Sequence, residues 1–247
     1  MSTLLKRFRG SSLSKIGRET ILKNKVSKII TLLEGEYGTP EFDSFDDPLD
    51  ELIVTLLSQN TTWQNCRTAF DNLKRRFRTW DRVRKAKTEE ITDAIKCGGL
   101  GKVKGGRIKS LLDFLYRRRK SLSLNFLKRM GTGEALEFLS GLKGVGPKTR
   151  ACVLLFSLKR PVLPVDTHIL RVSKRLGLID SQANLVKAHE LLGRIVPENR
   201  VLSFHINLIQ HGRRICRPLN PKCDECVLKS LGCQARVQPT TLRNSKN

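Results

Sequence analysis

Four cysteines near the C-terminus have a spacing that suits a metal centre. They follow the pattern C-x6-C-x2-C-x6-C and comprise Cys216, Cys223, Cys226 and Cys233. Four thiolates can complete either a tetrahedral zinc site or a four-iron, four-sulfur cluster. A zinc ribbon more often has two close pairs of cysteines, whereas only the middle two are a close pair here. The spacing therefore predicts a four-thiolate site and leaves the metal open.

A second pattern, LKGVGPKTRACVLLF, places Lys148 directly after a glycine turn. Glycine permits the tight backbone turn that GVG requires, and Pro147 suits the first turn of the helix that follows. The free amides at such a helix start can bind an anion such as a DNA phosphate. The pattern is that of a helix–hairpin–helix, with an ordinary helix–helix turn as the alternative.

An aspartate stands at the start of the next predicted helix. Asp166 follows the proline-rich stretch RPVLPV, and the residues after it have the apolar spacing of one helix face. Its carboxylate can be an ordinary helix N-cap. It can also have a second role, as a carboxylate held at a helix start near Lys148, which stands eighteen residues earlier.

The composition favours a polyanionic partner. The chain of 247 residues has 47 lysines and arginines against 23 acidic residues, a net charge of +24 and a pI near 10.3. Nucleic acid is the first candidate and an anionic membrane surface the second, with a merely basic or ribosome-associated protein as the alternative. No apolar run approaches the roughly 20 residues of a membrane span. Seven cysteines, an odd number, favour a reducing compartment.

The segments that must position these residues are helical in pattern. Apolar residues recur at helical spacing over 49–57, 108–115 and 185–195, and no sustained alternation predicts a strand. Glycine-rich breaks at 97–106, 131–133 and 144–146 are expected to separate helical runs. Residues 1–13 are interpreted as a basic arm, with a transit peptide as the alternative. Basic clusters that can face phosphate lie at 73–78, 117–120, 158–160 and 211–214.

Taken together, LKGVGPKTRACVLLF and PVDTHILRVSKRLGL resemble the helix–hairpin–helix DNA glycosylases of the endonuclease III type, and the resemblance covers residues 20–233. It implies an all-α, two-lobe fold with a cluster-bound C-terminal loop. The expected parts are a basic arm at 1–13, a helical barrel lobe with the hairpin at 41–160, a cluster lobe made of 14–40 and 161–233, and a tail at 234–247.

The resemblance also assigns roles to particular residues. It makes Lys148 the catalytic lysine and Asp166 the catalytic aspartate. LLSQNTTW resembles a helix end whose polar side chain enters the gap left by an extruded base; this maps onto Asn60, where the family often has glutamine, with Gln59 beside it. GGLGK resembles a loop that carries an intercalating wedge, which maps onto Leu100. DNA backbone contacts are implied for the hairpin residues Gly144, Val145, Gly146 and Thr149.

For the four cysteines the resemblance implies a four-iron, four-sulfur cluster, with zinc as the alternative. The last gap of the family pattern is commonly five residues, whereas this chain has six, and Gly232 is expected to accommodate the extra one. The implied role is structural, because the cluster would order a loop from which Lys222 and Lys229 contact DNA.

The expected function is base-excision repair by a bifunctional DNA glycosylase and abasic-site lyase that acts on oxidised pyrimidines in double-stranded DNA, as a monomer without a membrane partner. Alternatives are a glycosylase for mismatched uracil or thymine or for a modified cytosine and, from another class, a non-catalytic DNA-binding or damage-sensing protein. The expected location is the cytoplasm or nucleoid of a prokaryote, or the nucleus or mitochondrion of a eukaryote. The sequence does not name the damaged base.

Overall fold

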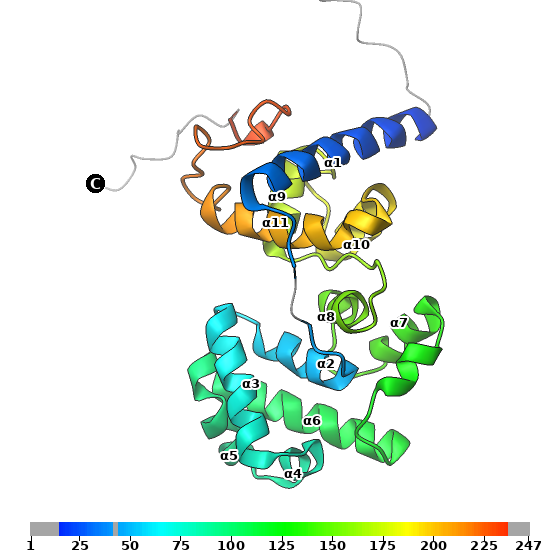
Figure 1. The fold of residues 1–247 in the computed structure, drawn as a ribbon, viewed down its shortest axis with the longest axis vertical. Helices are drawn as coiled ribbons and strands as arrows, with labels where there is room; N and C mark the ends of the chain where they lie inside the picture. Colours follow the sequence, from blue (N-terminus) through cyan, green and yellow to red (C-terminus); the bar gives the residue numbers. More distant parts are fainter. Residues whose placement is uncertain (1–14, 42–43, 237–247) are drawn as a thin grey trace, which may run out of the picture. The chain divides into compact units, whose positions relative to one another are not determined.

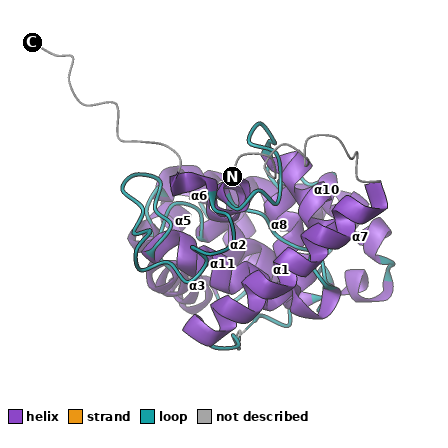
Figure 2. Cartoon of the chain, turned by 90° about the horizontal axis from the view of Figure 1, so that it is seen from above, coloured by secondary structure: helices purple, strands orange, loops and turns teal. Residues whose placement is uncertain are grey.

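The computed structural model describes residues 15–41 and 44–236, and within them the chain consists of helices and loops. Figure 2 shows no strand over these described parts, so the all-α prediction is confirmed for them. The predicted basic arm and the tail beyond residue 236 lie outside the described residues. No described helix is long and apolar enough to cross a membrane.

The chain divides into two compact units. One is Glu41–Asp166, and the other joins Met1–Pro40 to Thr167–Asn247. The first lobe is expected to end at residue 160, whereas the extended stretch that leads up to Asp166 belongs to this unit in the structure. Lys148 and Asp166 therefore lie in the same unit.

The unit Glu41–Asp166 contains most of the helices (Figure 1). Its α-helices are α2 (Pro48–Leu57), α3 (Trp63–Phe77), α4 (Trp80–Lys85), α5 (Thr88–Ala94), α6 (Gly101–Arg119), α7 (Thr132–Ser140) and α8 (Pro147–Cys152). Short 3-10 turns span Lys96–Gly98 and Asn125–Arg129, and a π-helical turn over Val153–Ser157 continues α8.

Helix α2 is the central element of this unit. Its start is fixed by Asp47, whose carboxylate accepts hydrogen bonds from the backbone N–H groups of Leu49 at 2.8 Å and Asp50 at 3.3 Å, and by Pro48 in the first turn. Every residue of α2 except Asp50 is buried. The helix contacts α3, α6 and α8, so it supports both the hairpin and the turn that follows α2 itself.

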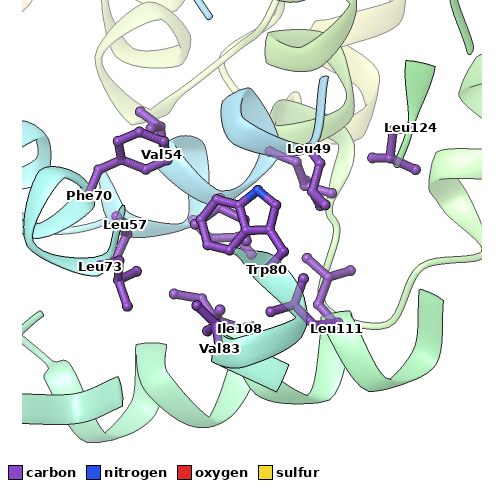
Figure 3. Close-up of a cluster of buried hydrophobic side chains, with 14 of the residues drawn as sticks. Leu49, Val54, Leu57, Phe70, Leu73, Trp80, Val83, Ile108, Leu111 and Leu124 are labelled. Carbon is purple, nitrogen blue, oxygen red and sulfur yellow. The ribbon is translucent and has the colours of Figure 1, made fainter. Parts of the chain in front are cut away.

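Aliphatic side chains from several helices form the core around α2, and Figure 3 shows Trp80 among them. The indole N–H of Trp80 donates to Asp50 at 2.7 Å, which satisfies its one polar group while the ring packs on Leu49 and its neighbours. Each fully buried leucine contributes about 1.5–3 kcal/mol. This core makes the unit a firm support for the loops at its surface.

The expectation that residues 97–106 form one break between helices is wrong for its second half. Helix α6 begins at Gly101 and continues to Arg119. A Cβ atom at Gly105 would lie 2.7 Å from the hydroxyl oxygen of Thr92, and one at Gly101 would lie 3.2 Å from the carbonyl oxygen of Thr92. These glycines serve close packing of α6 on α5, which a sequence pattern cannot distinguish from a loop.

The second unit contains α1 (Lys15–Tyr37), α9 (Thr167–Arg175), α10 (Leu185–Ile195) and α11 (Val201–Arg214). Helix α1 lies beside α11 (Figure 1) and also contacts α10, while α9 packs on α11. Glu34 of α1 accepts hydrogen bonds from Arg200 and Ser203 and so ties α1 to the start of α11. The chain beyond α11 carries the four cysteines in a loop that ends in a 3-10 turn at Gln234–Arg236.

Candidate functional site

The glycine turn forms a hairpin between α7 and α8. Gly144 has φ +83°, a conformation that other residues rarely adopt, and Gly146 is the extended residue that precedes α8. Val145 between them is buried and anchors the turn to the core. A Cβ atom at either glycine would meet nothing within 4 Å, so the space in front of the turn is open. A phosphate can therefore approach the amides at the start of α8.

Lys148 is the second residue of α8 and is partly buried, while its neighbour Thr149 is buried. Asp166 is partly buried at the end of the extended stretch, directly before α9. Burial raises the pKa of the Cys152 thiol to about 12; the charge of Lys148 lowers it and that of Asp166 raises it. The fold thus brings Lys148 and Asp166 into electrostatic reach of one buried thiol.

Two polar residues of α2 lie in the same neighbourhood and were missed by the sequence analysis. The hydroxyl of Thr55 donates to the Glu51 carboxylate at 3.1 Å, and the Thr55 side chain lowers the pKa of the Cys152 thiol. Glu51 is 3% exposed, and its burial raises the pKa of its carboxyl to about 7. The sequence gives only a weak indication of their role. They are polar residues at positions where the apolar pattern of 49–57 predicts core side chains.

The two predicted gap-filling segments form adjacent turns. Asn60 is exposed with φ +53°, and Leu100 is 55% exposed with φ +50°, where it precedes α6. A Cβ atom at Gly99 would lie 4.0 Å from the carbonyl oxygen of Asn60, which places the turns side by side. The guanidinium of Arg107 donates to the Gln59 side-chain oxygen at 3.0 Å and links the turns again.

Lys148 acts on the same buried thiol, Cys66, as a lysine that lies beneath the two turns. Burial raises the pKa of the Cys66 thiol to about 11, and the charges of Lys104 and Lys148 both act on that thiol in the opposite direction. Lys104, which sequence reasoning also missed, is buried beneath the two turns. Lys104 and Lys148 thus both act on Cys66, whose thiol donates to the carbonyl oxygen of Val54 in α2 at 3.3 Å.

The four cysteines lie together in the loop after α11. Cys216 is buried and the other three are partly buried. Burial raises the pKa of the Cys226 thiol, and the other three cysteines raise it further, so all three lie within electrostatic reach of Cys226. Gly232, before the last cysteine, has φ +68°. Lys222 and Lys229 are exposed on this loop, where Lys222 pairs with Glu225 at 2.9 Å.

Side chains from the neighbouring helices hold this loop. Arg171 of α9 donates to the carbonyl oxygens of Gly212 at 2.8 Å and Cys216 at 3.0 Å, and Arg175 donates to the Cys216 sulfur at 3.3 Å. His211 of α11 lies 3.5 Å from the Cys226 sulfur and 3.1 Å from the Tyr37 hydroxyl. None of these contacts is readable from spacing in the sequence.

Within the described residues, no three His, Cys, Asp or Glu side chains are assembled as a metal site. The chemistry of the donor set nevertheless fits a four-thiolate group, since four sulfurs share one loop and two of them contact Arg175 and His211. The basic cluster at 211–214 needs a correction. His211 is 1% exposed, and burial lowers its pKa to about 4, so this residue is a neutral interior group and contacts no phosphate.

The helical hairpin with a lysine in its second helix and an aspartate at the next helix start defines the class of a helix–hairpin–helix DNA glycosylase. Residues 53–198 match the family described as HhH-GPD superfamily base excision DNA repair protein. The chain is 36% identical over 184 residues to endonuclease III of Thermotoga maritima, covering 74% of this chain and 82% of that protein. It belongs to the HhH-GPD superfamily of base excision DNA repair proteins, as a DNA glycosylase of the endonuclease III type.

Other relatives and solved structures agree with this assignment. A candidate DNA glycosylase of Arabidopsis thaliana is 41% identical over 168 residues, which cover 68% of this chain and 57% of that longer protein. The fold matches the endonuclease III in a non-covalent complex with DNA with a TM-score of 0.74 at 24% identity, covering 87% of this chain and 97% of that one. A thermostable thymine-DNA glycosylase matches with a TM-score of 0.71 at 21% identity, covering 87% of this chain and 98% of that one.

Proposed function

We propose that this protein is a bifunctional enzyme that removes a damaged base from double-stranded DNA and then cleaves the strand at the abasic site. The observation that carries the proposal is the position of Lys148 on the first turn of α8, in the same unit as Asp166, which directly precedes the next α-helix. A glycosylase without lyase activity has no need of an amine there. A non-catalytic sensor would need neither residue.

The reaction starts with extrusion of the damaged nucleotide, because its sugar cannot be reached inside the duplex. The amides of Gly144–Gly146 hold the DNA backbone, since nothing obstructs approach to this turn. Leu100 and Asn60 occupy the space that the extruded base leaves. Both are exposed on adjacent turns, and an apolar wedge compensates part of the lost stacking.

The chemistry then proceeds at C1′ of the extruded nucleotide. The amine of Lys148 attacks C1′ as the bond to the base breaks; the electron pair leaves with the base, which takes up a proton. The carboxylate of Asp166 stabilises the positive charge that develops on the sugar. Opening of the sugar ring yields a Schiff base between Lys148 and C1′. Loss of a C2′ proton then expels the 3′ phosphate with the electron pair of its C–O bond.

Oxidised pyrimidines are the substrate class we propose, in keeping with the identity of 36% to a bacterial endonuclease III. A mismatched thymine or uracil, or a modified cytosine, is the second candidate. It is favoured by the fold likeness to a thymine-DNA glycosylase and by a match of 27% identity to a DNA glycosylase/AP lyase of Arabidopsis thaliana that is much longer than this chain. Excision from a panel of duplexes with one lesion each distinguishes the two.

We further propose that the four cysteines of the C-terminal loop hold a four-iron, four-sulfur cluster, with zinc as the alternative. The residues that would bind it are Cys216, Cys223, Cys226 and Cys233. Such a group supplies cross-linking of a loop by metal–thiolate bonds. Arg175 and His211 would lie against its ligands, and the exposed Lys222 and Lys229 would face the DNA backbone from the ordered loop.

The proposed function is tested by trapping with borohydride on a duplex with one abasic site. The wild type should form a covalent complex through the Schiff base. Lys148→Gln should lose trapping and base excision by about 1,000-fold or more while DNA binding remains, because a nucleophile cannot be replaced by an amide. Asp166→Asn should slow both steps and also preserve binding.

Lys143→Gln is the matched control, because Lys143 is an exposed lysine of the same hairpin outside α8. It should trap at a rate close to that of the wild type. Trapping by Lys148→Gln at the wild-type rate would show that another amine is the nucleophile, and the enzymatic role proposed for the hairpin lysine would then be wrong.

A further inference from the structure

Lys104 is a buried lysine that connects two turns of the backbone. Its side chain is 2% exposed, although it lies in the first turn of α6. The ammonium donates to the carbonyl oxygen of Leu57 at 2.7 Å and to that of Gly98 at 2.7 Å. Leu57 is the last residue of α2, and Gly98 ends the 3-10 turn before α6. One side chain therefore holds two segments that are far apart in sequence.

Each of these carbonyls directly precedes a turn with unusual backbone geometry. Asn60, just beyond Leu57, has φ +53°, and Leu100, just beyond Gly98, has φ +50°. Positive φ is costly for residues with a side chain, by about 1–2 kcal/mol relative to the right-handed region, and persists where the surroundings enforce it. The hydrogen bonds from Lys104 fix the chain immediately before both positions.

The same two turns are linked again at the surface. Arg107, one helical turn after Lys104 on α6, donates to the side-chain oxygen of Gln59 at 3.0 Å. The backbones of Asn60 and Gly99 approach closely enough for a Cβ at Gly99 to lie 4.0 Å from the Asn60 carbonyl. The two turns and the start of α6 therefore form one connected block.

A buried ammonium is an expensive way to connect two loops. Removing it from water disfavours its charged form, and a buried charge can often be replaced by an apolar side chain without loss of stability. The last carbonyls of α2 carry the partial negative charge of a helix end, which favours a cation there. What the lysine supplies beyond packing is a fixed separation between two specific carbonyl groups.

We infer that Lys104 is a positioning residue that holds Asn60 and Leu100 as a rigid pair at the separation needed to enter a gap in a DNA duplex. This inference rests on the proposed function and adds a residue that touches neither the DNA nor the reacting atoms. Lys104 contributes to the step that extrudes the nucleotide, so its loss should slow the reaction on duplex DNA. It has no part in the attack of Lys148 on a sugar that is already accessible.

The chain provides a closely matched control on the same helix. Lys109 of α6 also donates from its ammonium to two backbone carbonyls, those of Arg84 at 2.5 Å and Ala86 at 2.7 Å. These carbonyls end α4, apart from the turns at Asn60 and Leu100. Lys104→Met and Lys109→Met each remove one positive charge and two hydrogen bonds to backbone carbonyls. Only Lys104→Met should loosen the pair formed by Asn60 and Leu100.

The experiment compares borohydride trapping of an abasic site in a duplex with trapping of the same site in a single strand, where no base stack has to be opened. Rates are normalised to the fraction of protein that can be trapped on the single strand. Lys104→Met should lower the duplex rate by about tenfold or more and the single-strand rate by less than about twofold, because only the geometry of insertion is changed. Lys109→Met should change both rates by less than about twofold.

A double-mutant cycle shows through which group Lys104 acts. If it acts by positioning the wedge, Lys104→Met should lower the duplex rate by less than about twofold in a Leu100→Ala background, since coupled residues are not additive. A 2-aminopurine base opposite the abasic site should fluoresce less on binding of Lys104→Met than on binding of Lys109→Met. The signal should fall because looser turns unstack the neighbouring base less.

Equal duplex-to-single-strand ratios for folded Lys104→Met and Lys109→Met, or fully additive effects of Lys104→Met and Leu100→Ala, would overturn the inference. If Lys104→Met does not fold, Lys104→Gln serves instead, because its shorter amide still donates but cannot span the two carbonyls as lysine does. An unchanged ratio in that variant overturns the inference as well. Failure of the wild type to be trapped on either substrate would instead refute the proposed function, and the inference with it.

Discussion

The hairpin region and the cysteine loop are two functional regions built on different physical principles. The hairpin, α8 and the turns around Asn60 and Leu100 rest on α2, whose side chains are almost all buried. The cysteine loop has one short 3-10 turn after α11 and is held by polar side chains of α9 and α11. The first region obtains its geometry from a packed core, and the second depends on hydrogen bonds and on the proposed metal group.

This difference predicts which perturbations each region tolerates. A close-packed core transmits the strain of a small change in side-chain volume, but it remains folded when a single surface group is lost. A loop without a core of its own depends on each cross-link, as small metal-bound modules do.

The largest effect is expected for Cys223→Ser. With the proposed cluster present, the purified wild type should contain iron and absorb near about 400 nm, as iron–sulfur proteins do. The variant should lose iron and solubility together, because structural metal sites contribute on the order of 10 kcal/mol to folding. Cys97→Ser, an exposed cysteine outside the loop, should retain both. Stoichiometric zinc without iron in the wild type would contradict the choice of metal.

Arg171→Met tests whether polar contacts hold the cysteine loop. The change leaves the carbonyls of Gly212 and Cys216 without their donor, and we expect a loss of about 3 kcal/mol in stability. Limited proteolysis should cut the loop faster, while borohydride trapping through Lys148 on single-stranded abasic DNA should remain. A loop as protected as in the wild type would mean that Arg171 is dispensable there.

Glu51→Gln tests the polar residues inside the core beneath the hairpin. Burial raises the carboxyl pKa from the ordinary 4.5 to about 7, so the folded state holds the proton more tightly than the unfolded state. The contribution of Glu51 to stability should therefore be greatest below about pH 4.5, fall between about pH 4.5 and 7, and stay level above that range. The glutamine variant should be more stable than the wild type by about 2 kcal/mol at pH 8 and equal to it at pH 4.5.

Urea unfolding at both pH values measures this difference. An identical pH dependence of the wild type and Glu51→Gln would show that the carboxyl titrates normally.

The smallest effect on stability is expected for Gly144→Ala in the hairpin turn. A side chain at φ +83° costs about 1 kcal/mol, and the new methyl group would stand where a phosphate is proposed to bind. Gly133→Ala is the control, because Gly133 lies inside α7 with open space around it, where alanine should stabilise by about 0.5–1 kcal/mol. The temperature of thermal unfolding should fall for Gly144→Ala and rise for Gly133→Ala, and DNA affinity should fall for Gly144→Ala alone. Equal behaviour of the two variants would show that the turn does not need its glycine.

Much of the fold was predictable, since the helices at 49–57, 108–115 and 185–195 follow from apolar spacing alone. Gly101 and Gly105 were misread as part of a loop, because close packing on Thr92 and a flexible turn both require the absence of a side chain. The residues proposed for catalysis and metal binding were named from motifs. Their partners on other elements, such as Thr55, Glu51 and Lys104, were missed because no local pattern connects them to those motifs.

The sequence by itself determined the helical class, the basic charge, the glycine turn with its lysine and the four-cysteine spacing, because these depend on residue type and short-range periodicity. Only the tertiary structure decided that the turns at Asn60 and Leu100 lie side by side and that one buried ammonium joins them. It also decided that His211 belongs to the interior and contacts no phosphate. Such facts depend on which atoms meet when distant segments pack, and burial then fixes their charge and hydrogen bonds.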